Sequence, residues 1–198
     1  MTTIDYYNQN AQSFVEGSLK ADMSSHYDRF LRFIPEGGKI LDLGCGSGRD
    51  TKVFSDMGYQ VTAVDGSEEL CKLAEQYTGQ PVRCLMFDEL DYTEEFDGIW
   101  ACASLLHVEK KQIHDILCKV SKALKPDGIL YASFKYGSEE YEKEGRTFSN
   151  HKENDIPTLF NEGTQLVPVE WWKSQDVRPG REGEMWLNVM GKHKIKKT

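Results

Sequence analysis

The residues whose types and spacing point most directly to chemistry lie in the stretch KILDLGCGSGRDTKVFSDMGYQVTAVDGSEEL, residues 39–70. Gly44, Gly46 and Gly48 alternate directly after an apolar run. A glycine loop between a strand and a helix lets backbone amides approach a ligand closely, because no side chain is in the way. Asp65 closes the next apolar run, where a carboxylate accepts hydrogen bonds from both hydroxyls of a ribose. The stretch therefore predicts a nucleoside site.

The spacing of these glycines excludes two common nucleotide sites. The pyrophosphate-binding pattern G-x-G-x-x-G requires a third glycine at position 49 or 51, and these positions hold Arg49 and Thr51. No Gly-Lys-Ser/Thr follows, so the loop is not a P-loop. The G-x-G-x-G loop, preceded by Asp42, suits a ligand without phosphates. We expect an adenosine site in which Asp88 accepts from the adenine amine; the alternative is a tight strand-to-helix turn without a ligand.

The elements that must position these residues alternate along the chain. Apolar runs at 39–43, 60–64, 81–86, 97–102 and 128–134 predict strands, and amphipathic segments at 49–57, 67–77 and 110–124 predict helices. This alternation indicates βαβ units and an α/β fold with a parallel sheet covered on both faces. Two later β-rich runs, 165–177 and 185–191, have hairpin spacing and predict an added antiparallel pair.

The two remaining regions have no clean period. Residues 1–20 predict a flexible or loosely helical arm, and residues 135–155 predict a polar, charged loop whose EEYEKE run is a solvated, mobile face. We expect one domain over 1–198, with 1–20 as the arm or lid and 21–198 as the core.

Composition narrows the class of partner and compartment. The 198 residues include 24 Lys plus Arg and 32 Asp plus Glu, a net charge of −8, which makes tight binding to nucleic-acid backbones unlikely. The basic tail, 192–197, favours a solvated terminus over an RNA contact. Five cysteines without a Cys-x-x-Cys pair indicate a reducing, cytoplasmic compartment. No apolar run approaches 18 residues, so neither secretion nor membrane spanning is expected.

Four motifs together resemble one enzyme family. ILDLGCGSGRD, VTAVDGSEEL, FDGIWACASLLHV and ALKPDGILYASF occur in the order typical of class I S-adenosylmethionine (SAM)-dependent methyltransferases. The branch that the chain most resembles is the small bacterial tellurite-resistance-like group, and the resemblance covers about residues 4–191. It implies SAM as the cofactor, S-adenosylhomocysteine (SAH) as its product, and a Rossmann-like seven-stranded sheet of order 3-2-1-4-5-7-6 with strand 7 antiparallel.

The resemblance also implies which residues hold the cofactor. Gly44 and Gly46 would face its methionine part, with Asp42 organising the loop, and Asp65 would bind the ribose. The adenine would lie beside a second set of residues, Gly66, Ser67, Phe87 and Asp88. Ala101 and Cys102 would approach the methionine amino group through backbone carbonyls.

Three further candidates have an alternative structural explanation. Arg49 opens a helix, where a cation opposes the macrodipole, so we expect it to pair with the methionine carboxylate or with Asp50. His107 is either a general base or substrate contact, or a hydrogen-bonded loop histidine. Tyr7, with Tyr6 and Phe14, forms either an aromatic lid over the sulfonium, where a ring face favours positive charge, or a hydrophobic latch.

The acceptor is predicted from Arg146, Arg178 and Arg181, which follow the parallel sheet in an acidic chain and favour a small anionic molecule. Methyl transfer from a sulfonium needs alignment more than an acid–base set, which accounts for the lack of a triad or metal cluster in the sequence. We expect methyl transfer to a small acceptor. The alternatives are a cofactor-binding module without catalysis and a methyltransferase acting on RNA or protein; Arg49 in place of a glycine disfavours a nicotinamide dehydrogenase.

Overall fold

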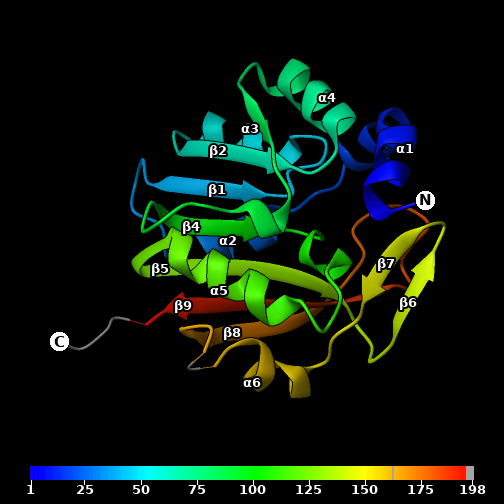
Figure 1. The fold of residues 1–198 in the computed structure, drawn as a ribbon. Helices are drawn as coiled ribbons and strands as arrows, with labels where there is room; N and C mark the ends of the chain where they lie inside the picture. Colours follow the sequence, from blue (N-terminus) through cyan, green and yellow to red (C-terminus); the bar gives the residue numbers. More distant parts are fainter. Residues whose placement is uncertain (162, 195–198) are drawn as a thin grey trace.

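A computed structural model describes residues 1–161 and 163–194 (Figure 1). Its main sheet contains seven strands: β1 (Lys39–Leu43), β2 (Gln60–Asp65), β3 (Val82–Cys84), β4 (Phe96–Ala101), β5 (Leu124–Lys135), β8 (Leu166–Gln175) and β9 (Met185–His193). The α-helices are α1 (Thr3–Ser18), α2 (Ser24–Leu31), α3 (Arg49–Asp56), α4 (Glu68–Thr78), α5 (Ile113–Ala123) and α6 (Ile156–Leu159). Single 3-10 turns form η1 (Phe87–Glu89), η2 (Leu105–His107) and η3 (Glu153–Asp155), and a separate hairpin joins β6 (Glu140–Lys143) to β7 (Arg146–Ser149).

The order of strands across the main sheet is β3-β2-β1-β4-β5-β9-β8. β1 pairs in parallel with β2 and β4, whereas β9 runs antiparallel to both β5 and β8. Counted within this sheet alone, the order is 3-2-1-4-5-7-6 with the seventh strand antiparallel, so the predicted fold class is confirmed. The labels differ because β6 and β7 form a sheet of their own.

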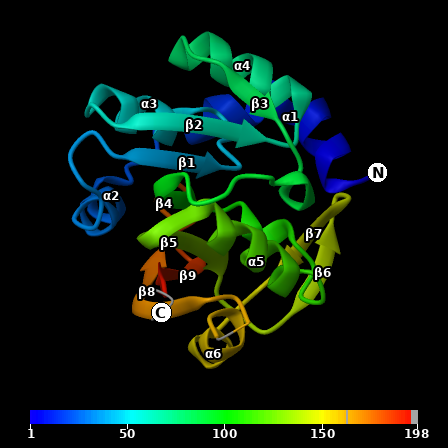
Figure 2. The ribbon, with the colours of Figure 1, turned by 60° about the vertical axis from the view of Figure 1, so that its left-hand side comes forward.

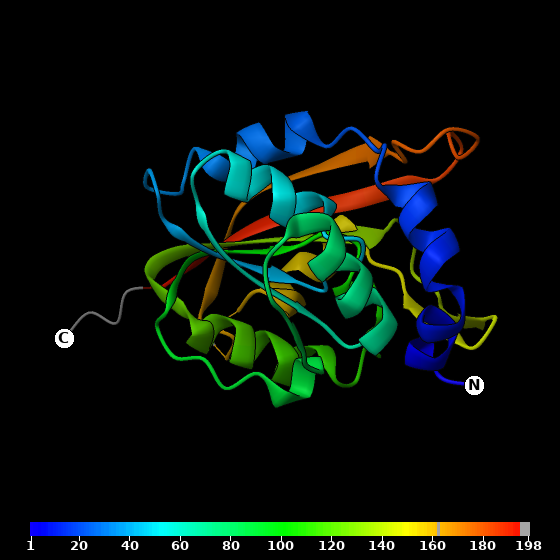
Figure 3. The same cartoon turned by 90° about the horizontal axis from the view of Figure 1, so that it is seen from above.

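Helices cover both faces of the sheet (Figures 2 and 3). Neighbouring residues of a strand point to opposite faces, so Leu41 packs in the cluster that includes the buried face of α5, while Ile40 packs with residues of α2 and α3. On the second face Trp100 and Tyr131 stack with ring centroids 4.0 Å apart. Burial on both sides fixes the register of the central strands and holds their carboxyl ends at one edge.

Residues 1–18 are more regular than the predicted loosely helical arm. Thr2 caps α1 through a capping box with Asp5, and the helix is interrupted only at Asn10. Ala11 and Val15 of α1 are buried in one apolar cluster with Leu70 of α4, and Figure 2 shows the two helices side by side. The contact with α4 supplies the burial that stabilises α1, and a single-helix period could not reveal it.

The prediction that residues 135–155 form an irregular loop is wrong, because this region contains the β6–β7 hairpin. Lys143 pairs with Arg146 across a two-residue turn in which Glu144 and Gly145 have φ values of 53° and 79°. Two positive φ angles match the right-handed twist of the flanking strands. The rings of Tyr141 and Phe148 stack 5.2 Å apart on one face of the hairpin. The many charged side chains of residues 140–146 hid the strand pattern in the sequence.

The termini add two observations. Lys192 is paired with Asp127 at 2.8 Å, and the part of the predicted basic tail beyond Lys194 lies outside the described residues. Within the described ranges, no helix is both long and apolar enough to span a bilayer.

Candidate active site

The glycine loop after β1 has the conformation that its sequence predicts. Gly44, Gly46 and Gly48 have φ values of 78°, 55° and 78°, in the left-handed region that favours glycine. A Cβ atom on Gly44 would lie 2.5 Å from Cβ of Ser104, and one on Gly46 would lie 2.9 Å from the Phe14 ring. Other side chains therefore pack closely on the loop and leave no room for a Cβ atom at Gly44 or Gly46. The backbone of both glycines lines the cavity.

Asp65 is held at the end of β2 by backbone amides. Its Oδ2 accepts from the amide of Gly46 and its Oδ1 from the amide of Ser67, both at 2.9 Å. Burial raises the pKa of Asp65, while these amide hydrogen bonds oppose the rise. Each carboxylate oxygen retains a further lone pair, so the side chain still offers acceptors to a ligand.

One cavity of about 950 Å³ lies over the carboxyl ends of the parallel strands, where ligands bind in open α/β sheets. It brings together most of the predicted site residues: Tyr7, Gly44, Gly46, Arg49, Asp65, Gly66, Phe87, Cys102, His107, Arg146, Arg178 and Arg181. Ligand pockets measure roughly 300–1,000 Å³, so this cavity lies at the upper end of that range.

Four predicted residues are not part of the lining: Asp42, Ser67 and Ala101 are buried, and Asp88 is exposed. Asp42 is buried and accepts a hydrogen bond from Thr51 Oγ1 at 2.6 Å, and Ala101 is fully buried in β4. Ser67 caps α4, where its hydroxyl accepts from the amide of Leu70. Asp88 lies in η1, because β3 ends at Cys84 and is shorter than the predicted strand 81–86.

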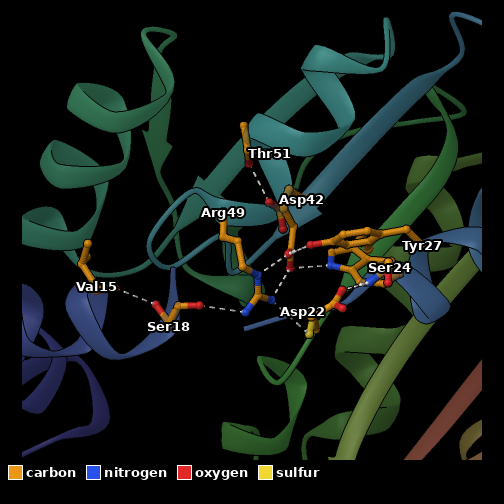
Figure 4. A network of polar contacts seen from close by, with 11 residues as sticks. Val15, Ser18, Asp22, Ser24, Tyr27, Asp42, Arg49 and Thr51 are labelled. Atoms are coloured by element: carbon orange, nitrogen blue, oxygen red, sulfur yellow. Dashed lines mark hydrogen bonds and ion pairs between the residues drawn. The ribbon is translucent and has the colours of Figure 1, made fainter. Parts of the chain in front are cut away.

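Arg49 pairs with its neighbour Asp50, one of the two partners that the sequence left open. Its Nε and Nη2 donate to the Asp50 carboxylate at 2.7 and 2.9 Å. Asp50 also accepts from the Tyr27 hydroxyl at 2.5 Å and from the Trp100 indole at 2.8 Å. Nη1 of Arg49 donates to the carbonyl of Ser18 at 3.2 Å (Figure 4), so the same guanidinium ties the end of α1 to the core.

Residues of helix α1 line the cavity beside the glycine loop. Phe14 packs against Gly46, and Ile4 reaches within 2.8 Å of the position that a Cβ on Gly66 would occupy. Oδ1 of Asn8 accepts from the Ser67 hydroxyl at 2.7 Å. The arrangement is that of a helix closed over the loop, with contacts at the start of α4.

His107 is bonded at both ring nitrogens. Its Nδ1 lies 2.7 Å from the carbonyl oxygen of Thr147, and its Nε2 lies 2.8 Å from the hydroxyl of Tyr7. Burial lowers the pKa of His107 to about 4 against the opposing effect of the Thr147 carbonyl, and Arg146 and Lys135 lower it further. The ring is therefore neutral at pH 7. No sequence pattern linked Tyr7 with His107, because the contact joins α1, η2 and β7.

The three predicted arginines line the same cavity, each with an acidic partner. Arg146 pairs with Glu144 at 2.6 Å, Arg178 with Asp176 at 2.5 Å, and Arg181 approaches Glu184 at 3.9 Å. The guanidinium of Arg146 also stacks on Tyr6, 3.8 Å from the ring centroid, and its buried Nε has no hydrogen-bond partner among the described residues.

Lys135 was not among the predicted site residues. It closes β5 and contributes a further cation to the cavity lining. Its Nζ lies 2.9 Å from the Glu184 carboxylate. The signal was its position at the carboxyl end of a parallel strand. Among the described residues, no group of three or more His, Cys, Asp or Glu side chains is placed to hold a metal ion.

Comparison with known proteins agrees with this geometry. Residues 41–132 match the protein-family model described as a methyltransferase domain. The Bacillus subtilis (strain 168) protein YqeM, whose name assigns it to the methyltransferases, is 33% identical over 135 residues, covering 60% of this chain and 55% of that protein. The chain spans about half the length of the curated relatives it matches.

Two solved structures have the same fold over nearly the whole chain. The Burkholderia thailandensis 1,6-didemethyltoxoflavin-N1-methyltransferase, with 1,6-didemethyltoxoflavin and SAH bound, is 22% identical, with a TM-score of 0.78 over 97% of this chain and 85% of that one. A TehB-like SAM-dependent methyltransferase from Corynebacterium glutamicum is 21% identical, with a TM-score of 0.70 over 96% and 97%. Residues 41–132 thus match a methyltransferase domain, and nearly the whole chain has the fold of these SAM-dependent methyltransferases.

Proposed function

We propose that this protein is a SAM-dependent methyltransferase whose acceptor is a small molecule with an anionic group. The observation that carries the proposal is that one cavity is lined both by the glycine loop with Asp65 and by the three arginines. A donor and an acceptor bound in one cavity meet without crossing solvent, and such positioning is the main requirement of methyl transfer.

The residues at the loop end fit SAM. The loop lacks the third glycine of a pyrophosphate site, and Asp65 offers carboxylate oxygens beside it, as a ribose without phosphates requires. Phe87 and Gly66 border the region in which we place the adenine, and Ser67 and Asp88 follow them directly in the sequence. Ala101 ends β4 and Cys102 follows it, next to the proposed position of the methionine amino group, and Asp42 would order the loop through its bond with Thr51.

When bound, SAM supplies a methyl group on a sulfonium, which leaves as a neutral thioether. The chain's own part is to align the acceptor, to exclude water and to hold the aromatic lid in place. Tyr7 and Phe14 of α1 line the cavity next to Gly46, which supports the assignment of α1 as the lid. His107 contacts the same lid and is our candidate for the group that receives the acceptor's proton.

The charges in the cavity lining support an anionic handle on the acceptor. Four cations line the cavity, Arg146, Arg178, Arg181 and Lys135, with three acids, Glu144, Asp176 and Glu184. This set has one cation in excess, and the buried Nε of Arg146 has no hydrogen-bond partner among the described residues. A carboxylate or similar oxyanion would complete these donors. We place the protein in the tellurite-resistance-like branch and in a reducing, cytosolic compartment; its five unpaired cysteines support the latter.

A methyl-transfer screen tests this proposal. Purified protein and SAM are incubated with small carboxylic acids, thiols, tellurite, selenite or RNA, and the SAH formed is measured. SAH above the no-acceptor level with a small anionic compound supports the proposal, whereas SAH only with RNA or protein assigns the activity to a macromolecule. Tight SAH binding without turnover of any acceptor favours a cofactor-binding module.

A further inference from the structure

Tyr7 lines the cavity, and both Asp65 and Arg146 lie close enough to act on its hydroxyl. It comes from α1 and bonds to Nε2 of His107 in η2, whose Nδ1 bonds to the Thr147 carbonyl in β7. These three residues form one chain of hydrogen bonds, and Arg146 also lies within hydrogen-bonding reach of the Tyr7 hydroxyl. One end of the chain is a backbone carbonyl, and the other is Tyr7, which lines the cavity.

The carbonyl fixes the direction of every bond in this chain. A carbonyl oxygen only accepts, so Nδ1 of His107 carries the hydrogen. The neutral ring then has its lone pair on Nε2, and the Tyr7 hydroxyl donates to it. The oxygen of Tyr7 has two lone pairs, so beside a donor from Arg146 it can still accept a hydrogen from a molecule in the cavity.

Charged groups surround this pair from several elements. Arg146 of β7 and Lys135 of β5 face His107, and Arg146 and Asp65 act on Tyr7. Arg178, before β9, is also close enough to interact with the Tyr7 hydroxyl. Burial dominates at both members of the pair and raises the pKa of Tyr7, so both are neutral at pH 7. The cations then face whatever negative charge the acceptor brings or develops.

We propose that Tyr7 is a catalytic residue that passes the acceptor's proton to His107 during methyl transfer. The acceptor X–H bond breaks toward the Tyr7 oxygen while the Tyr7 proton moves to Nε2 of His107. The lone pair on X forms the bond to the methyl carbon, and the carbon–sulfur pair returns to sulfur. A neutral thioether and an imidazolium replace a sulfonium and an imidazole, so charge and atoms balance.

This inference rests on the proposed function and narrows its substrate. A carboxylate has no proton to lose at neutral pH, and tellurium in an oxyanion attacks through its own lone pair, so neither would use such a chain. The acceptor class that does use it carries a hydroxyl or ring N–H as the nucleophile. The anionic group would then be a separate handle, held by the arginines that line the cavity near Tyr7.

The competing explanation is that the Tyr7–His107 bond only latches α1 in its closed position. Two substitutions separate these roles. Tyr7→Phe keeps the ring and removes the hydroxyl, whereas His107→Gln keeps an amide oxygen that accepts from Tyr7 but is not basic. A latch tolerates His107→Gln, and a proton relay does not. Tyr77→Phe and His114→Gln, both on exposed positions outside the cavity, are matched controls.

The activity experiment uses the three hydroxybenzoate isomers as probes, each with its methoxybenzoate counterpart, which keeps the carboxylate but lacks the hydroxyl. We expect SAH from at least one hydroxybenzoate and none above background from the methoxybenzoates. With that probe, Tyr7→Phe and His107→Gln should each lower kcat about 100-fold or more, with KM and the SAH dissociation constant within about threefold. Wild-type kcat/KM should stay level down to about pH 5.

If the methoxybenzoates turn over as fast as the hydroxybenzoates, the acceptor is not a hydroxyl or ring N–H compound. The same conclusion follows if the protein binds SAH but methylates no hydroxybenzoate. A near-normal kcat in His107→Gln overturns the relay and leaves the latch. Nitrogen-15 spectra of the SAH-bound protein give a readout without turnover: the relay requires the neutral Nδ1–H form of His107 at pH 6, and a protonated or Nε2–H ring contradicts it. Failure to bind SAH at all would instead refute the proposed function.

Discussion

The backbone amide of Gly46 donates a hydrogen bond of 2.9 Å to the carboxylate of Asp65. This contact links the glycine loop after β1 to the end of β2, the two features that marked the site in the sequence. The carboxylate is therefore part of the loop's structure as well as a proposed ribose acceptor. Replacing it should affect both binding and stability.

We expect Asp65→Ala to weaken SAH binding by about 1.5–3 kcal/mol, because hydrogen bonds to a charged acceptor are lost. The change also leaves the amides of Gly46 and Ser67 without their acceptor, so the free energy of unfolding should fall by about 1–3 kcal/mol. Isothermal titration and denaturant unfolding measure the two effects. Unchanged SAH affinity in the folded variant would show that Asp65 only orders the loop.

A second prediction concerns the buried ion pair below α1. Arg49→Gln leaves the Asp50 carboxylate without its cation, and such a loss costs about 3–5 kcal/mol of stability. Hydrogen exchange at the end of α1 should accelerate, since the bond to the Ser18 carbonyl is lost as well. Arg29→Gln removes an exposed pair with Glu170 and should cost less than about 1 kcal/mol. Equal losses in the two variants would contradict this account.

We expect the free energy of unfolding to depend on pH through Asp42. Burial, followed by the nearby charge of Asp50, raises the pKa of Asp42 to about 8. The folded protein holds a proton there that the unfolded chain releases above about pH 4. Its contribution to stability is therefore complete below pH 4 and is lost as the pH rises toward 8.

Melting temperatures at pH 5 and pH 8 test this sign. The wild-type protein should lose stability between these values, and Asp42→Asn should lose distinctly less. Asp56→Asn changes an exposed carboxylate on α3 and should keep the wild-type difference. If Asp42→Asn retains the full pH difference, Asp42 is not the group responsible.

The arginines should differ in their effect on the acceptor. Arg178 is bonded to Asp176 through both Nε and Nη2, and Arg181 is more exposed, whereas Arg146 keeps a free Nε. Arg146→Gln should therefore raise the acceptor's KM the most, roughly 10-fold or more for a lost charged hydrogen bond. SAH affinity should not change. A uniform loss of SAH binding in all three variants would mean that this end of the cavity shapes the cofactor site instead.

The sequence predicted the parts of the site that local patterns encode. The loop at Gly44 and Gly46, the strand end at Asp65 and the α/β alternation all follow from short spacings and apolar periods. The two partners of His107 could not be predicted in this way. Tyr7 reaches it from α1, and Thr147 reaches it from a hairpin whose charged residues hid the strand pattern. Long-range contacts of this kind depend on how elements pack, and one sequence does not reveal them.

The most direct test of the central claim is isothermal titration of the purified protein with SAH and, separately, with NADH. We predict saturable binding of SAH at one site and no binding of NADH. SAH at 100 times its dissociation constant should also stabilise the fold by about 2.7 kcal/mol. Binding of NADH in preference to SAH, or binding of neither, would contradict the assignment of this cavity to SAM.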